Sequence, residues 1–303
     1  MISFPYLGRR RAGRRSEAGL VAAVTVAAGL TGVPGVSVGA AVTGAKWSVE
    51  PTPNAVIANG SLAADVCVSA GWCVAVGSYE SRLGTSALAE VWNGTDWHIR
   101  AVPVPPGGTR SALDGVSCTT ASSCIAVGHY ISNQGVKVTL AERWNGTSWS
   151  LQPTPDPAGA KDSVLSGVSC GSATSCVAVG RTYYGRNQLA RLVEQWNGTA
   201  WSIKQASNPR NAALSALSGV SCVASTACVA VGNYLDYSSD DWLTLAEAWN
   251  GSTWTVTPSP NPAKSIVNNL SGVSCTTPTS CTAVGHYENQ ANMDVKLVEQ
   301  YSG

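Results

Sequence analysis

The sequence has little charge and few of the patterns that mark a helix, a metal site or a nucleic-acid partner. Charged residues make up 12% of the 303 residues against 44% hydrophobic ones, and 11 Trp accompany a single Phe. After residue 45 the chain carries 14 basic and 17 acidic side chains, a net charge of −3. This balance excludes a nucleic-acid-binding surface. Almost no stretch after residue 45 has the 3.6-residue apolar period of a helix, which favours an all-β fold.

The amino terminus has the order of a secretory signal peptide. Five arginines lie within the first fifteen residues, and an uncharged stretch with an apolar core at Leu20–Leu30 runs from Ala18 to Ala45. The alternative is a retained membrane anchor, since the stretch is long enough to span a bilayer, although glycines and Pro34 interrupt its second half. We expect residues 1–45 to be a signal peptide and leader on a secreted protein, with membrane contact only if the leader is retained.

All ten cysteines belong to one motif, in which Gly-Val-Ser-Cys, or Ala-Asp-Val-Cys in the first copy, is followed by five residues, Cys, one further residue and Ala-Val-Gly. Its five copies begin 51 to 53 residues apart, a period typical of propellers and repeat arrays. Zinc ligands usually lie closer together and beside a second pair, whereas an exported protein favours disulfides. We therefore predict no metal and five structural disulfides, namely Cys67–Cys73, Cys118–Cys124, Cys170–Cys176, Cys222–Cys228 and Cys275–Cys281.

Each repeat contains four short β runs. In the second copy these runs are Leu113–Cys118, Cys124–Tyr130, Thr139–Trp144 and Ser148–Gln152. The pattern predicts a five-bladed β-propeller of four-stranded blades over residues 46–303, with repeats near 60–110, 111–162, 163–214, 215–267, and 268–303 plus 46–59. The chain ends in a third run and begins with a fourth. The N-terminal strand should therefore close the ring, with Trp47–Glu50 paired antiparallel to Val298–Tyr301.

The third and fourth runs meet at Trp-Asn-Gly-Thr. Asn-Gly between apolar strands predicts a two-residue type I′ loop, which would place Trp92 opposite Thr95 and Glu90 opposite Trp97. Alternation then puts Leu88 on the same face as these residues, and we expect that face to pack against the next blade. The same asparagines fit a glycosylation signal, but turn chemistry already explains them.

Two segments carry a resemblance to a known family. GVSCTTASSCIAVGHY (Gly115–Tyr130) and LAERWNGTSW (Leu140–Trp149) resemble the repeats of secreted bacterial β-propeller proteins, similar in blade length to kelch and galactose-oxidase-like propellers. The resemblance covers about Lys46 to Gly303. It implies a fold and no activity, because galactose-oxidase-type copper ligands have no counterpart here, and no cofactor is expected.

Repetition separates structural residues from candidate site residues. A glutamate follows Leu-Ala or Leu-Val in every copy, and we expect these five to be structural, held by backbone N–H groups or by a neighbouring blade: Glu90, Glu142, Glu194, Glu247 and Glu299. His129 and His286 share the position that opens the most variable loop. They could bind an anion or a metal, with ordinary surface histidines as the alternative.

The variable loops between the second and third runs should share one face, where function usually resides. The candidate ligand-binding residues there are Tyr183, Tyr184, Arg186, Tyr237, Asp240, Asp241 and Trp242, together with His129 and His286. Aromatic rings beside Asp, Asn and Arg suit stacking on sugars, suit a protein partner equally, or pack on their own blade.

Three functions remain open. The first is a non-enzymatic extracellular module that binds a cell-envelope glycan or a protein. The second is a glycan hydrolase or lyase with its site at the propeller funnel, and the third is a purely structural surface protein. Glycosidic hydrolysis requires at least two carboxylates, and the predicted inner strands offer only Asp65 and Asp114. We therefore favour the first function, assign no catalytic residue and expect a monomer.

Overall fold

A computed structural model describes residues 47–53, 59–81, 84–206 and 208–302 of the chain. The chain divides into two units, Met1–Val49 and Glu50–Gly303, and the strands of the described residues belong to the second. The expected signal peptide lies outside the described residues. Those residues form no helix, and hence none that is long and apolar enough to cross a membrane.

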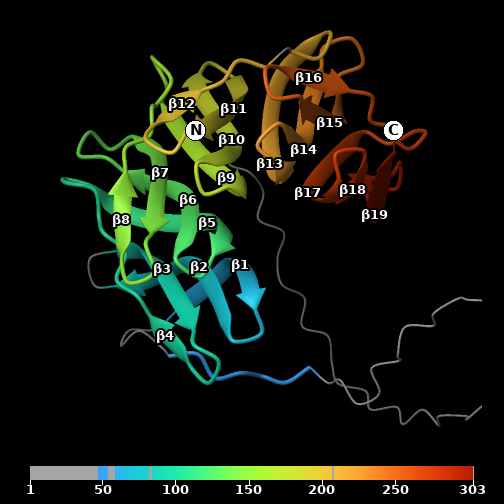
Figure 1. Ribbon diagram of the computed structural model, residues 1–303. Helices are drawn as coiled ribbons and strands as arrows, with labels where there is room; N and C mark the ends of the chain where they lie inside the picture. The colour runs from blue at the N-terminus through green and yellow to red at the C-terminus, as the bar shows by residue number, and fades with distance from the viewer. Residues whose placement is uncertain (1–46, 54–58, 82–83, 207, 303) are drawn as a thin grey trace, which may run out of the picture. The chain divides into compact units, whose positions relative to one another are not determined.

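The described residues form nineteen strands, which follow the repeat period. Figure 1 shows their arrangement. The first repeat forms β1 (Gly60–Ser69), β2 (Trp72–Ser81), β3 (Gly84–Trp92) and β4 (Trp97–Ile99). The second forms β5 (Thr109–Thr120), β6 (Ser123–Ile131), β7 (Lys137–Trp144) and β8 (Trp149–Gln152). The third forms β9 (Asp162–Ser172), β10 (Ser175–Gly185), β11 (Gln188–Trp196) and β12 (Trp201–Ile203).

The fourth repeat forms β13 (Ala212–Ala224), β14 (Ala227–Asp236), β15 (Asp241–Trp249) and β16 (Trp254–Thr257), and the fifth forms β17 (Val267–Thr277), β18 (Ser280–Glu288) and β19 (Asp294–Ser302). We call the sheet of each repeat a blade. Consecutive strands within a blade pair antiparallel, and single parallel bridges join β7 to β9 and β15 to β17. The all-β fold and the four strands of the first four repeats are thus confirmed.

One disulfide joins the first two strands of every blade, as predicted, and no described cysteine is free. In the second blade Cys118 and Cys124 lie directly opposite each other in the β5–β6 register. The C-x5-C spacing has this consequence because a tight turn after Thr120 returns the chain onto the same strand pair. Each bond therefore fixes the inner hairpin of its blade.

The Trp-Asn-Gly-Thr turn differs from the prediction. Trp144 pairs with Trp149, so the loop has four residues rather than two, and Trp92 likewise pairs with Trp97. Asn145 Oδ1 accepts hydrogen bonds from the backbone N–H groups of Thr147 and Ser148, both at 2.9 Å. Because the side chain caps the turn, only Gly146 needs a positive φ, at 100°. The two-residue type I′ loop was wrong, although the tryptophans still share one face.

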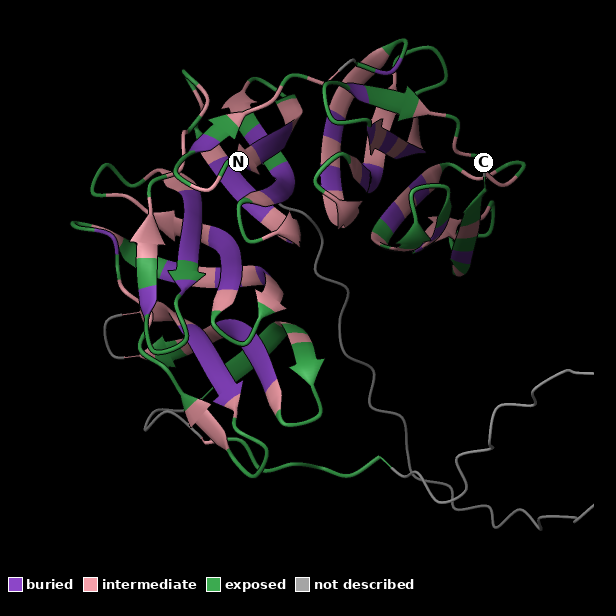
Figure 2. Cartoon of the chain, in the orientation of Figure 1, coloured by how far each residue is buried: buried purple, intermediate pink, exposed green. Residues whose placement is uncertain are grey.

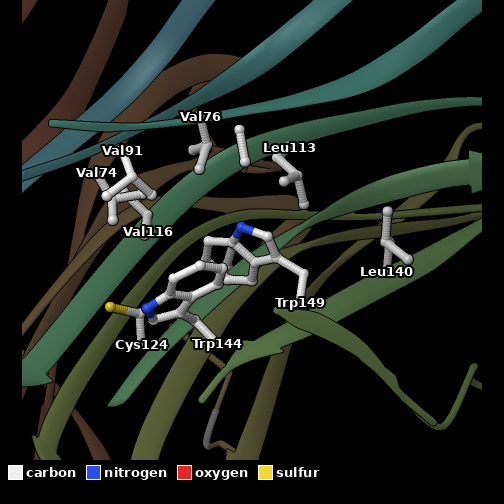
Figure 3. Packing of buried hydrophobic residues seen from close by; sticks show 11 residues of the cluster. Val74, Val76, Val91, Leu113, Val116, Cys124, Leu140, Trp144 and Trp149 are labelled. Carbon is white, nitrogen blue, oxygen red and sulfur yellow. The ribbon is translucent and has the colours of Figure 1, made fainter. Parts of the chain in front are cut away.

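The core lies between successive blades. Val74, Val76 and Val91 of the first blade pack against Leu113, Leu140, Trp144 and Trp149 of the second (Figure 3). The rings of Trp144 and Trp149 lie 5.5 Å apart at 47°. The glutamate-tryptophan face therefore packs on the preceding blade rather than on the next one, which corrects the expected direction. The other side of the contact comes from the second strand of the preceding blade, where Val74 and Val76 point toward the tryptophans.

Neighbouring inner strands also contact each other through their backbones. The amide of Cys170 donates to Ser117 Oγ at 3.0 Å, and equivalent bonds join Cys222 to Ser169 and Cys275 to Ser221. A Cβ on Gly115 would lie 3.0 Å from the Cα of the equivalent glycine in the next blade. The Gly-Val-Ser-Cys motif thus combines close approach with a hydrogen bond between blades.

The expected closure by an N-terminal strand is not among the strand pairs of the structure. Residues 47–53 carry no strand, and Trp47 and Val49 are fully exposed. β19 pairs with β18 alone and ends its sheet. Figure 2 shows that β1 and β19 are mostly exposed, whereas the middle strands are buried. Closure and the count of five blades in one ring therefore stay predictions.

Candidate functional site

The predicted loop residues form two groups on separate hairpins. Tyr183 and Tyr184 end β10, and Arg186 follows Gly185 in a turn where both have positive φ. Tyr183 is 37% exposed, and its carbonyl accepts a hydrogen bond from the amide of Lys161 at 2.7 Å. Tyr184 is half-buried, because alternation turns it to the opposite face of the strand. The third blade therefore presents the two tyrosines in different directions.

The second group lies on the β14–β15 hairpin of the fourth blade. Tyr237 is 74% exposed, while Trp242 is half-buried and its carbonyl accepts a hydrogen bond from Asn268 Nδ2 at 2.9 Å. Asp240 has a positive φ and Asp241 pairs with Asp236 across the hairpin. Among the described residues no hydrogen bond or ion pair links this hairpin to the tyrosines of the third blade. The sequence-predicted cluster is thus two clusters.

A pocket of about 550 Å³ lies beside Tyr184. It is formed by the link before the third blade, by β10 and β11, and by the segment after β12. Its lining residues include Pro157, Tyr184, Arg191, Ile203, Lys204 and Asn208. Pockets of this volume are typical of small-ligand sites, with an apolar wall and a few polar groups. Sequence reasoning found Tyr184 but missed Lys204 and Asn208, because β12 looked like an ordinary short strand.

The two cations of this pocket differ in their availability. Arg191 Nε lies 2.5 Å from Glu247 of the next blade, and Nη1 donates to Asn208 Oδ1 at 2.7 Å. The Arg191 side chain is only 6% exposed, so it contributes to the wall of the pocket and is already paired with Glu247. Lys204 is half-buried, and among the described residues no carboxylate pairs with its ammonium group. The pocket therefore offers one cation to a ligand.

His129 has a carboxylate partner that the sequence pattern did not assign to it. Asp114 is the extra residue of a β-bulge between Leu113 and Gly115, and its Oδ2 lies 2.9 Å from His129 Nδ1. Both side chains are partly exposed, and Arg181 occupies the register position of His129 one blade on. His286 has the same position in the last blade, and no described carboxylate forms an ion pair with it. The structure thus distinguishes the two histidines.

The recurring glutamates are buried between blades. Burial raises the pKa of Glu142 to about 8, and burial followed by the charge of Asp156 raises the pKa of Glu194 to about 8, against a hydroxyl of Thr139 that lowers it. Burial also raises the pKa of Glu247 to about 7, although Arg191 opposes the shift. These side chains are 0% exposed. They cannot reach a substrate, which supports the structural interpretation.

The partners of these glutamates come from the preceding blade. Glu247 meets Arg191, and Glu299 Oε2 accepts a hydrogen bond from Ser259 Oγ at 2.7 Å. Both oxygens of Glu142 lack a hydrogen-bond partner among the described residues. The expectation of a neighbouring-blade partner therefore holds for some copies, whereas among the described residues no backbone N–H group donates to these carboxylates. In the same part of the chain, no group of three or more His, Cys, Asp and Glu could hold a metal.

Comparisons with known proteins bear on the fold alone. No protein-family model matches the sequence, and no curated protein matches it. Similar solved structures are β-propeller proteins. An ulvan lyase from a new family of polysaccharide lyases is 13% identical with a TM-score of 0.49, over 80% of this chain and 66% of that one.

Two further solved structures are similar to this chain at comparable levels. A mutant of AofleA from Arthrobotrys oligospora is 14% identical with a TM-score of 0.47, over 76% of this chain and 66% of that one. YCF48 bound to D1 peptide is 12% identical with a TM-score of 0.43, over 80% and 67%. At this level of similarity these structures carry no information on what this chain binds or catalyses.

Proposed function

We propose that the protein is a non-enzymatic extracellular module that binds a saccharide in the pocket beside Tyr184. The observation that carries this proposal is the pocket itself, in which Tyr184, Lys204 and Asn208 line one hollow of about 550 Å³. Sugars combine a flat apolar face with hydroxyl groups, so a ring for stacking beside hydrogen-bonding groups suits them. Tyr183, Arg186, Tyr237, Asp240, Asp241 and Trp242 would then extend contact with a longer glycan.

The disulfides support an extracellular location. Every described cysteine is paired, and such bonds persist in oxidising compartments. Together with the signal peptide expected from the sequence, they favour secretion. We expect a monomer, which sedimentation of the purified protein would test. A protein partner in place of a saccharide is an outcome of the binding experiment below.

Binding can be tested with the purified full chain on a glycan array, followed by calorimetry with each positive glycan. Tyr184→Ala and Lys204→Ala should each weaken binding about five- to tenfold, because each removes a contact worth roughly 1 to 1.5 kcal/mol. Lys264→Ala, an exposed lysine outside the pocket, is the matched control and should bind normally. Full affinity in both pocket variants, or no glycan bound at all, would overturn the proposal.

A second candidate function is a glycan lyase or hydrolase at the funnel, and the His129–Asp114 pair favours it. A carboxylate at 2.9 Å orients an imidazole and allows it to accept a proton from a substrate. Among the described residues the buried glutamates offer no accessible second carboxylate, so proton abstraction from a uronate fits better than hydrolysis. Release of unsaturated uronate from a polysaccharide, lost in His129→Gln and retained in Lys204→Ala, would favour this function over simple binding.

We also propose that the five repeats are the blades of one ring, closed by the N-terminal strand. Residues Trp47-Ser48-Val49-Glu50-Pro51-Thr52-Pro53 match Trp149 to Pro155, which contains β8 and the start of its link. The last blade has three strands where the others have four. Deleting residues 46–53 should lower the melting temperature by several degrees, because it would leave β19 as an open edge. An unchanged melting temperature would contradict closure.

A further inference from the structure

A polar contact recurs where each blade meets the next. In each blade one residue of the third strand lies opposite the second-strand position that His129 occupies in the second blade. This third-strand residue is Thr139 in the second blade, Arg191 in the third and Thr244 in the fourth. Arg191 pairs with Glu247 of the following blade. Ser259 Oγ lies 2.8 Å from Thr244 Oγ1 and donates to Glu299 at 2.7 Å. This position therefore supplies the groups that face the buried glutamate one blade on.

The last blade carries the third-strand residue of this contact, and the first blade carries the glutamate. The equivalent residue in the last blade is Lys296, which pairs with His286 in the strand register and is exposed. Glu90 of the first blade is 2% exposed, and its Oε2 has no hydrogen-bond partner among the described residues. A cation without a carboxylate and a buried carboxylate oxygen without a partner thus lie at opposite ends of the repeat series.

The apolar faces of these two blades are also incomplete. Val284 and Val298 of the last blade are 49% and 62% exposed, whereas the equivalent Val231 is 1% exposed because the next blade covers it. On the first blade Leu62 is 46% exposed, while Leu113 at the same place in the second blade is fully buried. Each interface joins one kind of face to the other, so the two exposed faces are complementary.

The inner strand of the last blade keeps the contact motif without a neighbour. Gly272 and Ser274 occupy the places of Gly115 and Ser117. A Cβ on Gly272 would meet only Val284, at 3.8 Å, whereas one on Gly115 would meet the backbone of the next blade at 3.0 Å. Among the described residues no hydrogen bond reaches the Ser274 hydroxyl, although Ser117 accepts one from the next blade. The last blade is therefore shaped to receive another inner strand.

We propose that this strand is β1 of the same chain, and that Lys296 pairs with Glu90 across the contact as Arg191 pairs with Glu247. The inference rests on the proposed closure and adds its contact residues. Pro51-Thr52-Pro53 precedes the first blade as Pro258-Ser259-Pro260 precedes the last, so the chain carries a link that elsewhere joins two blades. Blades in one chain also meet at a far higher effective concentration than blades of two molecules.

A double-mutant cycle on the full chain tests the pair. Lys296→Ala should lower the melting temperature by several degrees, since it leaves a buried carboxylate without its cation, and Glu90→Gln should remove that sensitivity. Lys296→Arg should retain the wild-type melting temperature. Arg191→Ala with Glu247→Gln is the positive control, and Lys264→Ala combined with Glu90→Gln is the negative control. Additive effects of Lys296→Ala and Glu90→Gln would overturn the pair.

The remaining outcomes separate the pair from closure and from a second copy. If the cycle is additive while deletion of residues 46–53 still destabilises the protein, closure holds and the Lys296–Glu90 pair is wrong. If the coupling is present only at high protein concentration and sedimentation shows oligomers, the occupant is a second copy and the same-chain contact is overturned. Coupling in a monomer at every concentration supports the proposal.

Discussion

Replacing Glu142 by glutamine should change how the stability of this protein depends on pH. Glu142 lies on β7, is 0% exposed, and has no hydrogen-bond partner for either oxygen among the described residues. Glu247 has Arg191 of the preceding blade as its partner. The residue equivalent to Arg191 in the blade before Glu142 is Ala87, whose side chain has no hydrogen-bond donor. Glutamine keeps the shape of the side chain and removes its ionisation.

The magnitude follows from the pKa of Glu142, which burial raises from 4.5 to about 8. A carboxyl with a raised pKa binds its proton more tightly in the folded state, so no free energy is lost below pH 4.5. As pH rises from there to about 8, ionisation favours unfolding by about 1.4 kcal/mol per unit. The cost is about 3 kcal/mol at pH 7 and about 5 kcal/mol above pH 8.

Urea unfolding followed by tryptophan fluorescence at pH 5, 6, 7 and 8 would measure this cost. The free energy of unfolding of the wild type should fall relative to Glu142→Gln by about 1.4 kcal/mol with each pH unit. Glutamine brings an unpaired amide of its own, worth about 1 to 3 kcal/mol, but that term is independent of pH. Glu80→Gln, at an exposed position, is the control substitution.

The test is how the difference in unfolding free energy between wild type and Glu142→Gln changes with pH. A difference that is the same at every pH reflects only packing or the new amide group. Parallel curves for wild type and Glu142→Gln between pH 5 and 8 would mean that Glu142 is ionised in the folded protein and has a partner. Burial would then not control this glutamate. Glu194→Gln gives an independent repeat of the experiment, since the pKa of Glu194 is also raised to about 8.

Three further substitutions, two of them with a control, test the structure of the blades, and the melting temperature measures their effects. Gly180→Ala should destabilise the protein by more than about 3 kcal/mol, because its Cβ would lie 1.9 Å from the Val164 carbonyl oxygen, whereas Gly71→Ala has open space and should be neutral. Equal effects of the two would refute the steric explanation. Asn145→Ala should cost about 1 to 2 kcal/mol through the lost turn caps, and Asn145→Asp less. Ser169→Ala should cost about 1 kcal/mol, since it removes the acceptor of the next blade's cysteine amide; no change would mean that this bond contributes nothing.

Much of the fold was predictable because its signals are local and repeated. The ten cysteines at one spacing predicted five hairpin disulfides, since residues on either side of a tight turn become opposite neighbours in the same strand pair. Alternation along Leu88 to Trp92 predicted which side chains share a face. The loop at Asn145 was predicted at the right place but with the wrong length, because the sequence does not show that a side chain replaces the positive φ.

The candidate site was predicted only in part. Tyr184 was recognised by its place in a variable loop, whereas Lys204 and Asn208 lie beyond β12 and approach it through the packing of the third blade. The partner of His129 depends on a bulge that moves Asp114 out of the strand register. Separation of Tyr237 from Tyr184 likewise depends on which hairpin carries each residue.

The sequence by itself determined the repeat, the disulfides and the recurrence of a glutamate in every copy, because each is a matter of spacing within about 50 residues. Only the tertiary structure decided which blade each face contacts and what each glutamate meets. Glu247 lies beside Arg191, while Glu142 lies in an apolar contact and has a pKa of about 8. Identical local sequence leads to different chemistry because burial and charge are set by the neighbouring blade, where residues some 50 positions away come within hydrogen-bonding distance.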